Sequence, residues 1–214
     1  MVSFRSRRSG LLLTLSLCGL PPPLAAAPAV AAPLDLAHWV THLWQPVGAY
    51  GGLLTNDQTE DVVIVLHRRD AIADDPLLPV GSRALAVFSL GADGLYQRTT
   101  LLEGLLPCVQ CLGTINRDPQ ADPFEIEIAD RQLTVSWIGN ADGLVWVRLM
   151  IAWDERARAF GLAADEVVRG APLSGVSSRR TRDYRTGRAV TDGQVSAFPP
   201  GLVPLSRVRA ADYR

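Results

Sequence analysis

The sequence predicts a mainly β protein with a single antiparallel domain, and three observations indicate this class. Seven segments between residues 61 and 168 have strand length and are rich in Val, Ile, Leu, Phe and Trp. Short polar links with Asp, Asn or Gly separate most of them, as in antiparallel hairpins. The chain has 214 residues, 48% of them hydrophobic, with 21 basic against 22 acidic side chains, which is typical of a globular protein. We expect a meander, arranged as a sandwich or a partly open barrel, with a short N-terminal helix.

Residues 1–31 predict a cleaved secretory signal peptide. Three arginines precede a ten-residue apolar run at 11–20, and Ala29 and Ala31 supply the small side chains before the cleavage point. The run has about half of the roughly 20 residues that span a bilayer, and no later segment approaches that length. Cleavage leaves 183 residues (214 less 31) with 18 basic side chains (21 less 3) and 22 acidic ones. We therefore expect a periplasmic or secreted protein without a membrane span after signal removal.

Composition narrows the class of partner. All 21 basic residues are arginine, which indicates a GC-rich bacterial source. The charge is close to neutral, so no positive field attracts nucleic acid, and we expect no nucleic-acid partner. Cys18 in the apolar run raises lipidation as an alternative, although Leu17 stands where a lipid-attachment signal needs a small residue.

The elements of the β-rich domain, 32–197, follow in order. Apolar residues at helical spacing predict a helix over 35–44, with Asp35 as its cap and Pro46 as its stop. The predicted strands are 61–67, 83–90, 95–102, 124–128, 132–138, 144–153 and 159–168. The segment 144–150 is largely apolar on both faces, which predicts a central strand covered on both sides. The Pro-containing tail, 198–214, predicts a wrapped coil or a frayed end without chemistry of its own.

Cys108 and Cys111 form a C-x-x-C pair, and they are the two cysteines that remain after signal cleavage. In an oxidising compartment we expect a disulfide between them that stiffens a tight loop. Redox catalysis is the alternative, but a thioredoxin-like motif begins a helix after a βαβ unit, whereas strands are expected here on both sides.

The sequence contains few residues that could bind a metal or catalyse hydrolysis. His38 and His42 have a metal-ligand spacing on the predicted helix, but the glutamate of a zinc protease is missing between them. No G-x-S-x-G motif occurs, and the chain holds 3 histidines. Asp122 and Glu125 remain as carboxylates for an alternative hydrolase. We expect no catalytic residue, metal or cofactor.

An arginine-rich segment lies near the end of the predicted domain. Its members are Arg179, Arg180, Arg182, Arg185 and Arg188. Guanidinium groups bind carboxylates and phosphates, so the segment is a candidate patch for an anion or an acidic partner. The alternative is an edge strand that its charges keep soluble.

The acidic segment 53–61 resembles the calcium loop that leads into a strand in FG-GAP and VCBS-type repeat proteins. Asp57 and Asp61 match the third and last acidic positions of that loop. Leu53 and Thr55 replace the first two acids, and Gln58 replaces the glycine. The resemblance implies a calcium site that has lost ligands, in a loop that survives as the approach to a strand.

A wider resemblance covers roughly 51–190. It rests on a P-C-x-x-C-x-G segment at 107–113, a D-P-F-E hairpin that begins at Asp122, and the closing D-Y-R-T-G at 183–187. These motifs are similar to those of a family of uncharacterised exported bacterial proteins. The resemblance implies an exported β-rich fold with a C-x-x-C, and it implies no catalytic residue.

These observations favour a non-catalytic binding or interaction module of the cell envelope, with an envelope protein or a glycan as partner. Trp137, Trp146 and Trp153 fall on adjacent predicted strands and form either core or a recognition face. The alternatives are an envelope thiol–disulfide protein that uses Cys108 and Cys111, and a structural subunit of an envelope complex.

Overall fold

A computed structural model describes residues 43–68, 83–91, 93–107, 124–140, 144–170 and 177–213. All of them belong to the second of the two units of the chain, Ala32–Arg214. The fold is mainly β, as predicted, and every strand pairing is antiparallel. The strands are β1 (Trp44–Gly52), β2 (Asp61–Arg68), β3 (Arg83–Leu90), β4 (Tyr96–Glu103), β5 (Phe124–Ala129), β6 (Gln132–Asn140), β7 (Leu144–Asp154), β8 (Ala159–Gly170), β9 (Ser177–Asp183), β10 (Arg188–Thr191), β11 (Gln194–Ala197) and β12 (Val203–Pro204).

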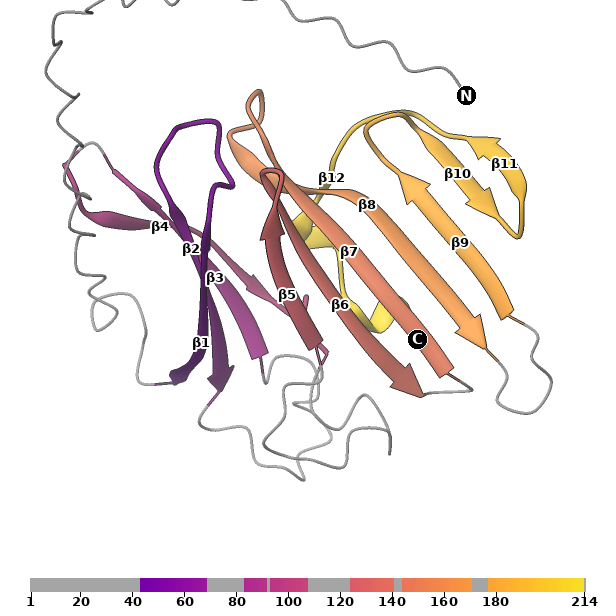
Figure 1. The fold of residues 1–214 in the computed structure, drawn as a ribbon, viewed down its shortest axis with the longest axis horizontal. Coiled ribbons are helices and arrows are strands. Elements are labelled where there is room, and N and C mark those ends of the chain that lie inside the picture. Colours follow the sequence, from indigo (N-terminus) through magenta and orange to yellow (C-terminus); the bar gives the residue numbers. More distant parts are fainter. Residues whose placement is uncertain are drawn as a thin grey trace, which may run out of the picture. The chain divides into compact units, whose positions relative to one another are not determined.

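The strands form two meanders (Figure 1). The first sheet has the order β1-β2-β3-β4, and the second has the order β11-β10-β9-β8-β7-β6-β5, with β12 beside β8. Neither sheet closes into a barrel within the described chain. The predicted central position of 144–150 is confirmed, because β7 pairs with β6 and with β8. Its outer residues Trp146, Arg148 and Met150 are half-buried, so the second face of this strand is less covered than predicted.

Local turn chemistry explains how the hairpins close. Asp130 and Arg131 have φ of 51° and 57°, the conformation of a type I′ turn, which matches the twist of the strands it joins. In the longer β7–β8 link, Asp154 Oδ1 accepts hydrogen bonds from the amides of Arg156 and Ala157 at 2.9 and 3.0 Å. Arg158 then takes a left-handed φ of 50° and returns the chain to β8. These links set the register of both hairpins.

One hydrophobic core joins the two sheets. Val63, Val65, Leu85 and Val87 from the first sheet pack with residues of the second, and their side chains are at most 1% exposed. The contributions of the second sheet at the centre of this core are Leu133, Val135, Val147, Leu149, Ile151 and Leu162. These residues follow a period of two along their strands, so the alternation of apolar residues in the sequence determines which face of each strand is buried.

The helix predicted over 35–44 is contradicted at its last residue. Trp44 is the first residue of β1 and not the end of a helix, and Pro46 lies inside this edge strand beside a bulge. Proline is tolerated there because the free edge of a strand needs no ladder donor. Residues 35–42 of the predicted helix, with His38 and His42, lie outside the described residues. The signal peptide with Cys18, and the residues Cys108, Cys111 and Asp122, lie outside them as well. Among the described residues, no helix has the length and apolar character needed to cross a membrane.

The C-terminal tail is packed and not frayed. It contains β12 and two 3₁₀ helices, η3 (Leu205–Arg207) and η4 (Ala210–Tyr213). Leu205, Val208 and Tyr213 are buried in the core that joins the sheets. The C-terminal tail is therefore an ordered part of the fold that contributes side chains to the core, which the sequence did not indicate.

Candidate functional site

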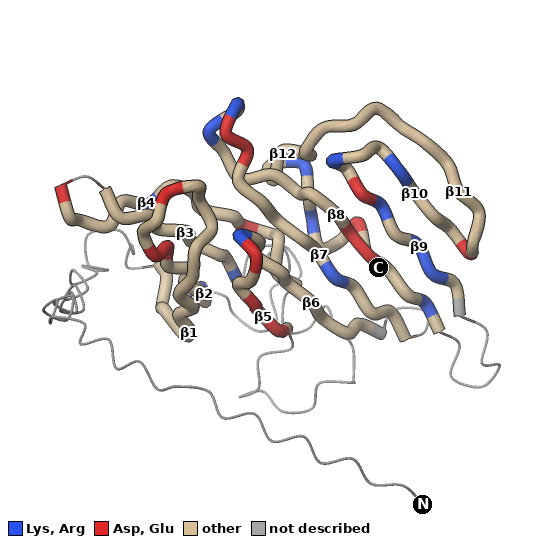
Figure 2. Tube along the Cα trace, turned by 45° about the horizontal axis from the view of Figure 1, so that its top comes forward, with Lys and Arg blue, Asp and Glu red and all other residues tan. Residues whose placement is uncertain are grey.

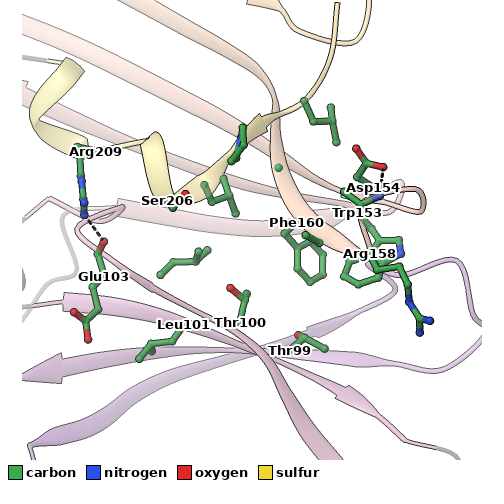
Figure 3. Close-up of a pocket in the computed structure, with 17 residues that line it drawn as sticks. Thr99, Thr100, Leu101, Glu103, Trp153, Asp154, Arg158, Phe160, Ser206 and Arg209 are labelled. Atoms are coloured by element: carbon green, nitrogen blue, oxygen red, sulfur yellow. Dashed lines mark hydrogen bonds between the residues drawn. The ribbon is translucent and has the colours of Figure 1, made fainter.

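A hollow of about 500 Å³ lies among three parts of the chain, which come from β4, the β7–β8 hairpin and the C-terminal segment (Figure 3). We call it the β4 pocket, and its lining is Thr99–Glu103, Trp153, Asp154, Ala157–Gly161, Leu202, Pro204, Leu205, Ser206 and Arg209. Its volume falls within the range of roughly 300 to 1,000 Å³ that is typical of ligand sites.

An aromatic pair forms one side of the β4 pocket. The rings of Trp153 and Phe160 are 5.0 Å apart with an interplanar angle of 66°, an edge-to-face contact. Phe160 is buried and Trp153 is half-buried, so part of the indole is open to the hollow. The pair holds its orientation because both side chains lie at the base of one hairpin, where Trp153 pairs with Phe160 across the strands. A large, oriented apolar surface of this kind suits a ligand contact.

Polar groups surround this aromatic side. Thr99 and Thr100 lie across the hollow, and Figure 3 shows Arg158 beside the aromatic pair and Arg209 on the C-terminal side. Arg209 Nη1 donates to the carbonyl of Glu103 at 3.4 Å. Arg158 is exposed and makes no ion pair within the described part of the chain. The pocket thus combines an apolar surface with hydroxyl groups, the two exposed cations and the carboxylates of Glu103 and Asp154.

The C-terminal wall of the pocket is held at two points. The amide of Ala210 donates to the carbonyl of Gly104 at 2.9 Å, directly after β4. The hydroxyl of Tyr213 donates to Asp165 Oδ2 at 2.9 Å in the second sheet. The tail therefore connects both sheets and positions Leu205, Ser206 and Arg209 at the pocket.

No family model, curated protein or solved structure matches this chain. The resemblance to an exported family therefore stays an expectation from the sequence.

Asp165 is the centre of a buried polar cluster that sequence reasoning missed. Its side chain is 0% exposed, and Arg182 donates to it through Nε at 2.9 Å and Nη2 at 2.5 Å. The hydroxyls of Tyr184 and Tyr213 donate to the same carboxylate at 3.0 and 2.9 Å. These partners come from β9, the turn that follows it and the C-terminus, so no local motif could have revealed the cluster.

The cluster changes the protonation of its members. Burial raises the pKa of Tyr184 to about 12, and the negative charge of Asp165 adds to this. Burial also raises the pKa of Tyr213, again together with the Asp165 charge. Burial alone would lower the pKa of Arg182, but its hydrogen bonds and charge interaction with Asp165 outweigh this effect, and the pKa is raised. All three groups therefore keep their protons, as donors to Asp165 must.

We expect alkaline conditions to destabilise the fold through these tyrosines. The pKa of Tyr184 rises from 10.0 to about 12 on folding, so the unfolded chain releases this proton first as the pH increases. The free energy of unfolding should be fully maintained below pH 10 and should fall between pH 10 and about 12. Urea unfolding across this range, with tyrosinate absorbance followed in parallel, measures the effect. The double variant Tyr184→Phe/Tyr213→Phe should show a shallower decline, and a decline equal to that of the wild type would contradict the prediction.

The predicted arginine patch is divided between the two faces of its sheet. Arg180 and Arg182 lie beside Val167 and Asp165 in the register and share their inner face. Arg179 faces outward, 2.5 Å from Glu166, and Arg188 faces outward opposite Asp183. Figure 2 shows the resulting mixture of acidic and basic residues on β8 to β10. Arg185 lies in the turn before β10, with Nη1 2.8 Å from the side-chain amide of Gln132.

The alternative explanation, an edge strand protected by charge, is wrong. β9 pairs with β8 on one side and with β10 on the other, and β11 forms that edge of the sheet. A second hollow, of about 340 Å³, lies on the outer face of these strands. Its lining includes Met150, Ala164, Glu166, Asp183, Arg188 and Val190, so it places both signs of charge around a small apolar floor.

Hydrogen bonds within the protein engage one carboxylate oxygen of each aspartate in the acidic loop, whereas Asp61 Oδ1 is buried and has no hydrogen-bond partner among the described residues. Asp57 Oδ1 accepts from the amide and hydroxyl of Thr59 at 3.0 and 2.7 Å. Asp61 Oδ2 accepts from the amides of Leu54 and Thr55 at 2.7 and 2.9 Å. The guanidinium of Arg131, on the β5–β6 turn, donates to the carbonyls of Thr55 and Asp57. An arginine of the second sheet thus takes carbonyl oxygens that a cation would use.

The loop also shows a pKa change and leads directly into a strand. Burial opposes ionisation of Asp57, but hydrogen bonds from Thr59 and the charge of Arg131 outweigh it, and the pKa of Asp57 is lowered. β2 begins at Asp61, as the strand prediction requires. Among the described residues, no group of three or more acidic, histidine or cysteine side chains is placed to hold a metal ion.

The three tryptophans have different environments. Trp137 is 5% exposed and belongs to the core, where it meets Tyr213 edge to face at 6.1 Å. Trp146 lies on the outer face of β7, and Trp153 lines the β4 pocket. Trp137 therefore belongs to the core, and Trp153 is a candidate for the recognition face that the sequence offered as the alternative. Glu125 is exposed on β5, away from the described pocket lining.

Proposed function

We propose that this chain is a non-catalytic binding module of the cell envelope, exported to the periplasm or secreted, and that its ligand occupies the β4 pocket. The observation that carries the proposal is the half-buried Trp153 ring, which is oriented by Phe160 at 5.0 Å and faces a hollow of ligand size. Export rests on the predicted signal peptide, residues 1–31. Fractionation of the source cells and N-terminal sequencing of the exported protein test that part.

The polar surroundings support binding. Thr100 and Ser206 offer hydroxyl groups in the lining, and Arg158 and Arg209 add exposed charges. The hydroxyl of Thr99 donates to the carbonyl of Val87 at 2.9 Å. Hydroxyl and guanidinium groups near an aromatic surface orient a ligand, because the apolar contact supplies affinity while the polar groups select the partner. The envelope partner is a protein or a glycan.

Two tryptophans on β7 allow a matched test. The purified chain without residues 1–31 is screened against two probes, a phage-displayed library of linear peptides and an array of soluble peptidoglycan fragments and envelope oligosaccharides. We expect a retained probe whose affinity falls at least tenfold in Trp153→Ala. Trp146→Ala removes the same side chain from the outer face of the same strand and should bind like the wild type.

Loss of folding must be separated from loss of binding. Trp153 also packs against the core, so Trp153→Ala is compared by thermal unfolding. Arg158→Gln offers a second pocket variant at an exposed side chain, and we expect weaker binding with unchanged thermal stability. Equal binding by Trp153→Ala, Arg158→Gln and the wild type, or no retention of either probe class, would reject the β4 pocket as the binding site.

A further inference from the structure

We infer that the β4 pocket takes an extended polypeptide segment, which adds to the free edge of β4 as a further strand. The inference rests on the proposed function and specifies its ligand class. The segment carries an apolar side chain for the aromatic pair and charged side chains beyond it. Peptide recognition of this kind uses main-chain hydrogen bonds for affinity and side-chain pockets for selection.

The pocket runs along an edge of the first sheet and not over one of its faces. Five consecutive residues of β4, Thr99–Glu103, line the hollow. Successive side chains of a strand point to opposite faces, and here Leu102 packs into the core between the sheets while Leu101 packs against the cluster on the other face. A surface that all five residues share must therefore be the backbone edge.

This edge is open within the described chain. β4 is the last strand of its sheet, and its only strand partner among the described residues is β3. An unpaired edge presents a row of N–H and C=O groups that can template another strand. The C-terminal segment bonds just beyond it, through the Ala210 amide and the Gly104 carbonyl, and leaves the edge before that point lining the hollow.

The position of one hydrogen bond shows which backbone groups point outward. Arg209, on the pocket side, donates to the carbonyl of Glu103, so this carbonyl points away from β3. Backbone groups alternate along an antiparallel strand between the two edges. The N–H and C=O of Leu101 therefore also point into the pocket. Thr99 has no partner in the register, because Val87 pairs with Thr100 and Phe88 pairs with Arg98. This bulge lies in β4 itself, so the regular edge begins at Thr100.

The dimensions and charges fit a peptide better than a glycan. At about 3.4 Å per residue, the five lining residues of β4 extend over about 17 Å, the length of a short strand. Trp153, Phe160 and Leu205 offer an apolar site beside this edge. The exposed cations Arg158 and Arg209 share the lining with the carboxylates of Glu103 and Asp154, so the lining complements side chains of both charges on either side of an apolar residue.

A proline and an alanine variant at one position test the inference. Leu101→Pro removes the outward N–H, whereas Leu101→Ala removes a similar amount of side-chain packing and keeps the N–H. Both variants are compared with the wild type for binding of linear peptides selected from the phage library. We expect Leu101→Pro to bind at least tenfold more weakly than Leu101→Ala, with similar thermal stability of the two variants.

A second measurement does not depend on the proline variant folding. Each residue of a selected peptide is N-methylated in turn, and its affinity for the wild type is measured. Strand addition predicts that methylation weakens binding at every second residue, because alternate amides point to β4. Bound peptide should also slow hydrogen exchange of the Leu101 amide in the wild type.

The outcomes separate this inference from the proposed function. Binding of oligosaccharides that depends on Trp153 but is equal in Leu101→Pro and Leu101→Ala would overturn the peptide inference and leave the binding module standing. Peptide binding without a two-residue N-methylation pattern would also overturn it. If no peptide is retained and the wild type self-associates while Leu101→Pro does not, the peptide inference is overturned. The partner at the β4 edge is then a second copy of the chain. Absence of any probe binding that depends on Trp153 would reject both proposals.

Discussion

Replacing Asp165 by asparagine should lower the free energy of unfolding by about 3 to 5 kcal/mol, the usual loss when one partner of a buried ion pair is removed. The carboxylate is fully buried and accepts from Arg182, Tyr184 and Tyr213. Asparagine keeps the size but removes the negative charge and turns one acceptor into a donor. Arg182 then keeps its charge in a partly buried place. The N–H₂ group faces Arg182 Nε if it takes the Oδ1 position, and it faces Arg182 Nη2 and both tyrosine hydroxyls if it takes the Oδ2 position. Urea unfolding at neutral pH measures the loss.

A solvent-exposed carboxylate of the same sheet provides the control. The Glu127 side chain is 65% exposed and 4.0 Å from Arg148, so Glu127→Gln should change the unfolding free energy by less than about 1 kcal/mol. Tyr213→Phe in the Asp165→Asn background should cost less than in the wild type, because the two residues share one network. An Asp165→Asn loss no larger than that of Glu127→Gln would show that the cluster does not stabilise the fold.

Gly187→Ala should cost about 2 to 5 kcal/mol, because a side chain there meets two obstacles. Gly187 has a φ of 68°, a left-handed conformation that costs other residues about 1 to 2 kcal/mol. A Cβ at this position would lie 2.1 Å from the carbonyl oxygen of Phe198, which is backbone and cannot turn aside. Relieving such overpacking costs about 1 to 3 kcal/mol more. Thermal and urea unfolding should both show the loss.

Gly193 supplies a matched comparison for Gly187. Its φ is 85°, and a Cβ at this position would have no atom within 4 Å, so Gly193→Ala carries the conformational cost alone. The difference between the two variants isolates the contact with Phe198. Because Phe198 begins the tail that lines the β4 pocket, Gly187→Ala should also weaken probe binding. Equal losses in the two variants would mean that the tail moves away at little cost.

The strands between Asp61 and Gly170 were predictable because their signals are local. Each predicted segment in this range is a strand, and no end differs by more than two residues from the prediction. Apolar side chains at alternate positions and short polar turns carry this information within about ten residues of chain. Such segments select the buried face by themselves, and hairpin links make each one pair with the next.

Other strands gave no such signal. β1 contains Pro46 and four glycines or alanines that pack little apolar surface. β9 is polar and rich in arginine, and β10 and β11 are short strands of four residues each. They become strands because their neighbours offer open backbone edges and because partners such as Asp165 neutralise Arg182. Propensity cannot report a partner that lies elsewhere in the sequence.

The sequence by itself determined the fold class, the order of the central strands and the face that each buries, since these follow from residues close together in the chain. Tertiary structure alone decided the site. The β4 pocket joins Thr99, Trp153 and Ser206, and the Asp165 cluster joins β8 to Tyr213. It also divided the arginines of β9 between two faces and placed Arg131 on the acidic loop. Contacts between distant segments depend on how the sheets pack, and a local pattern of residues does not encode that packing.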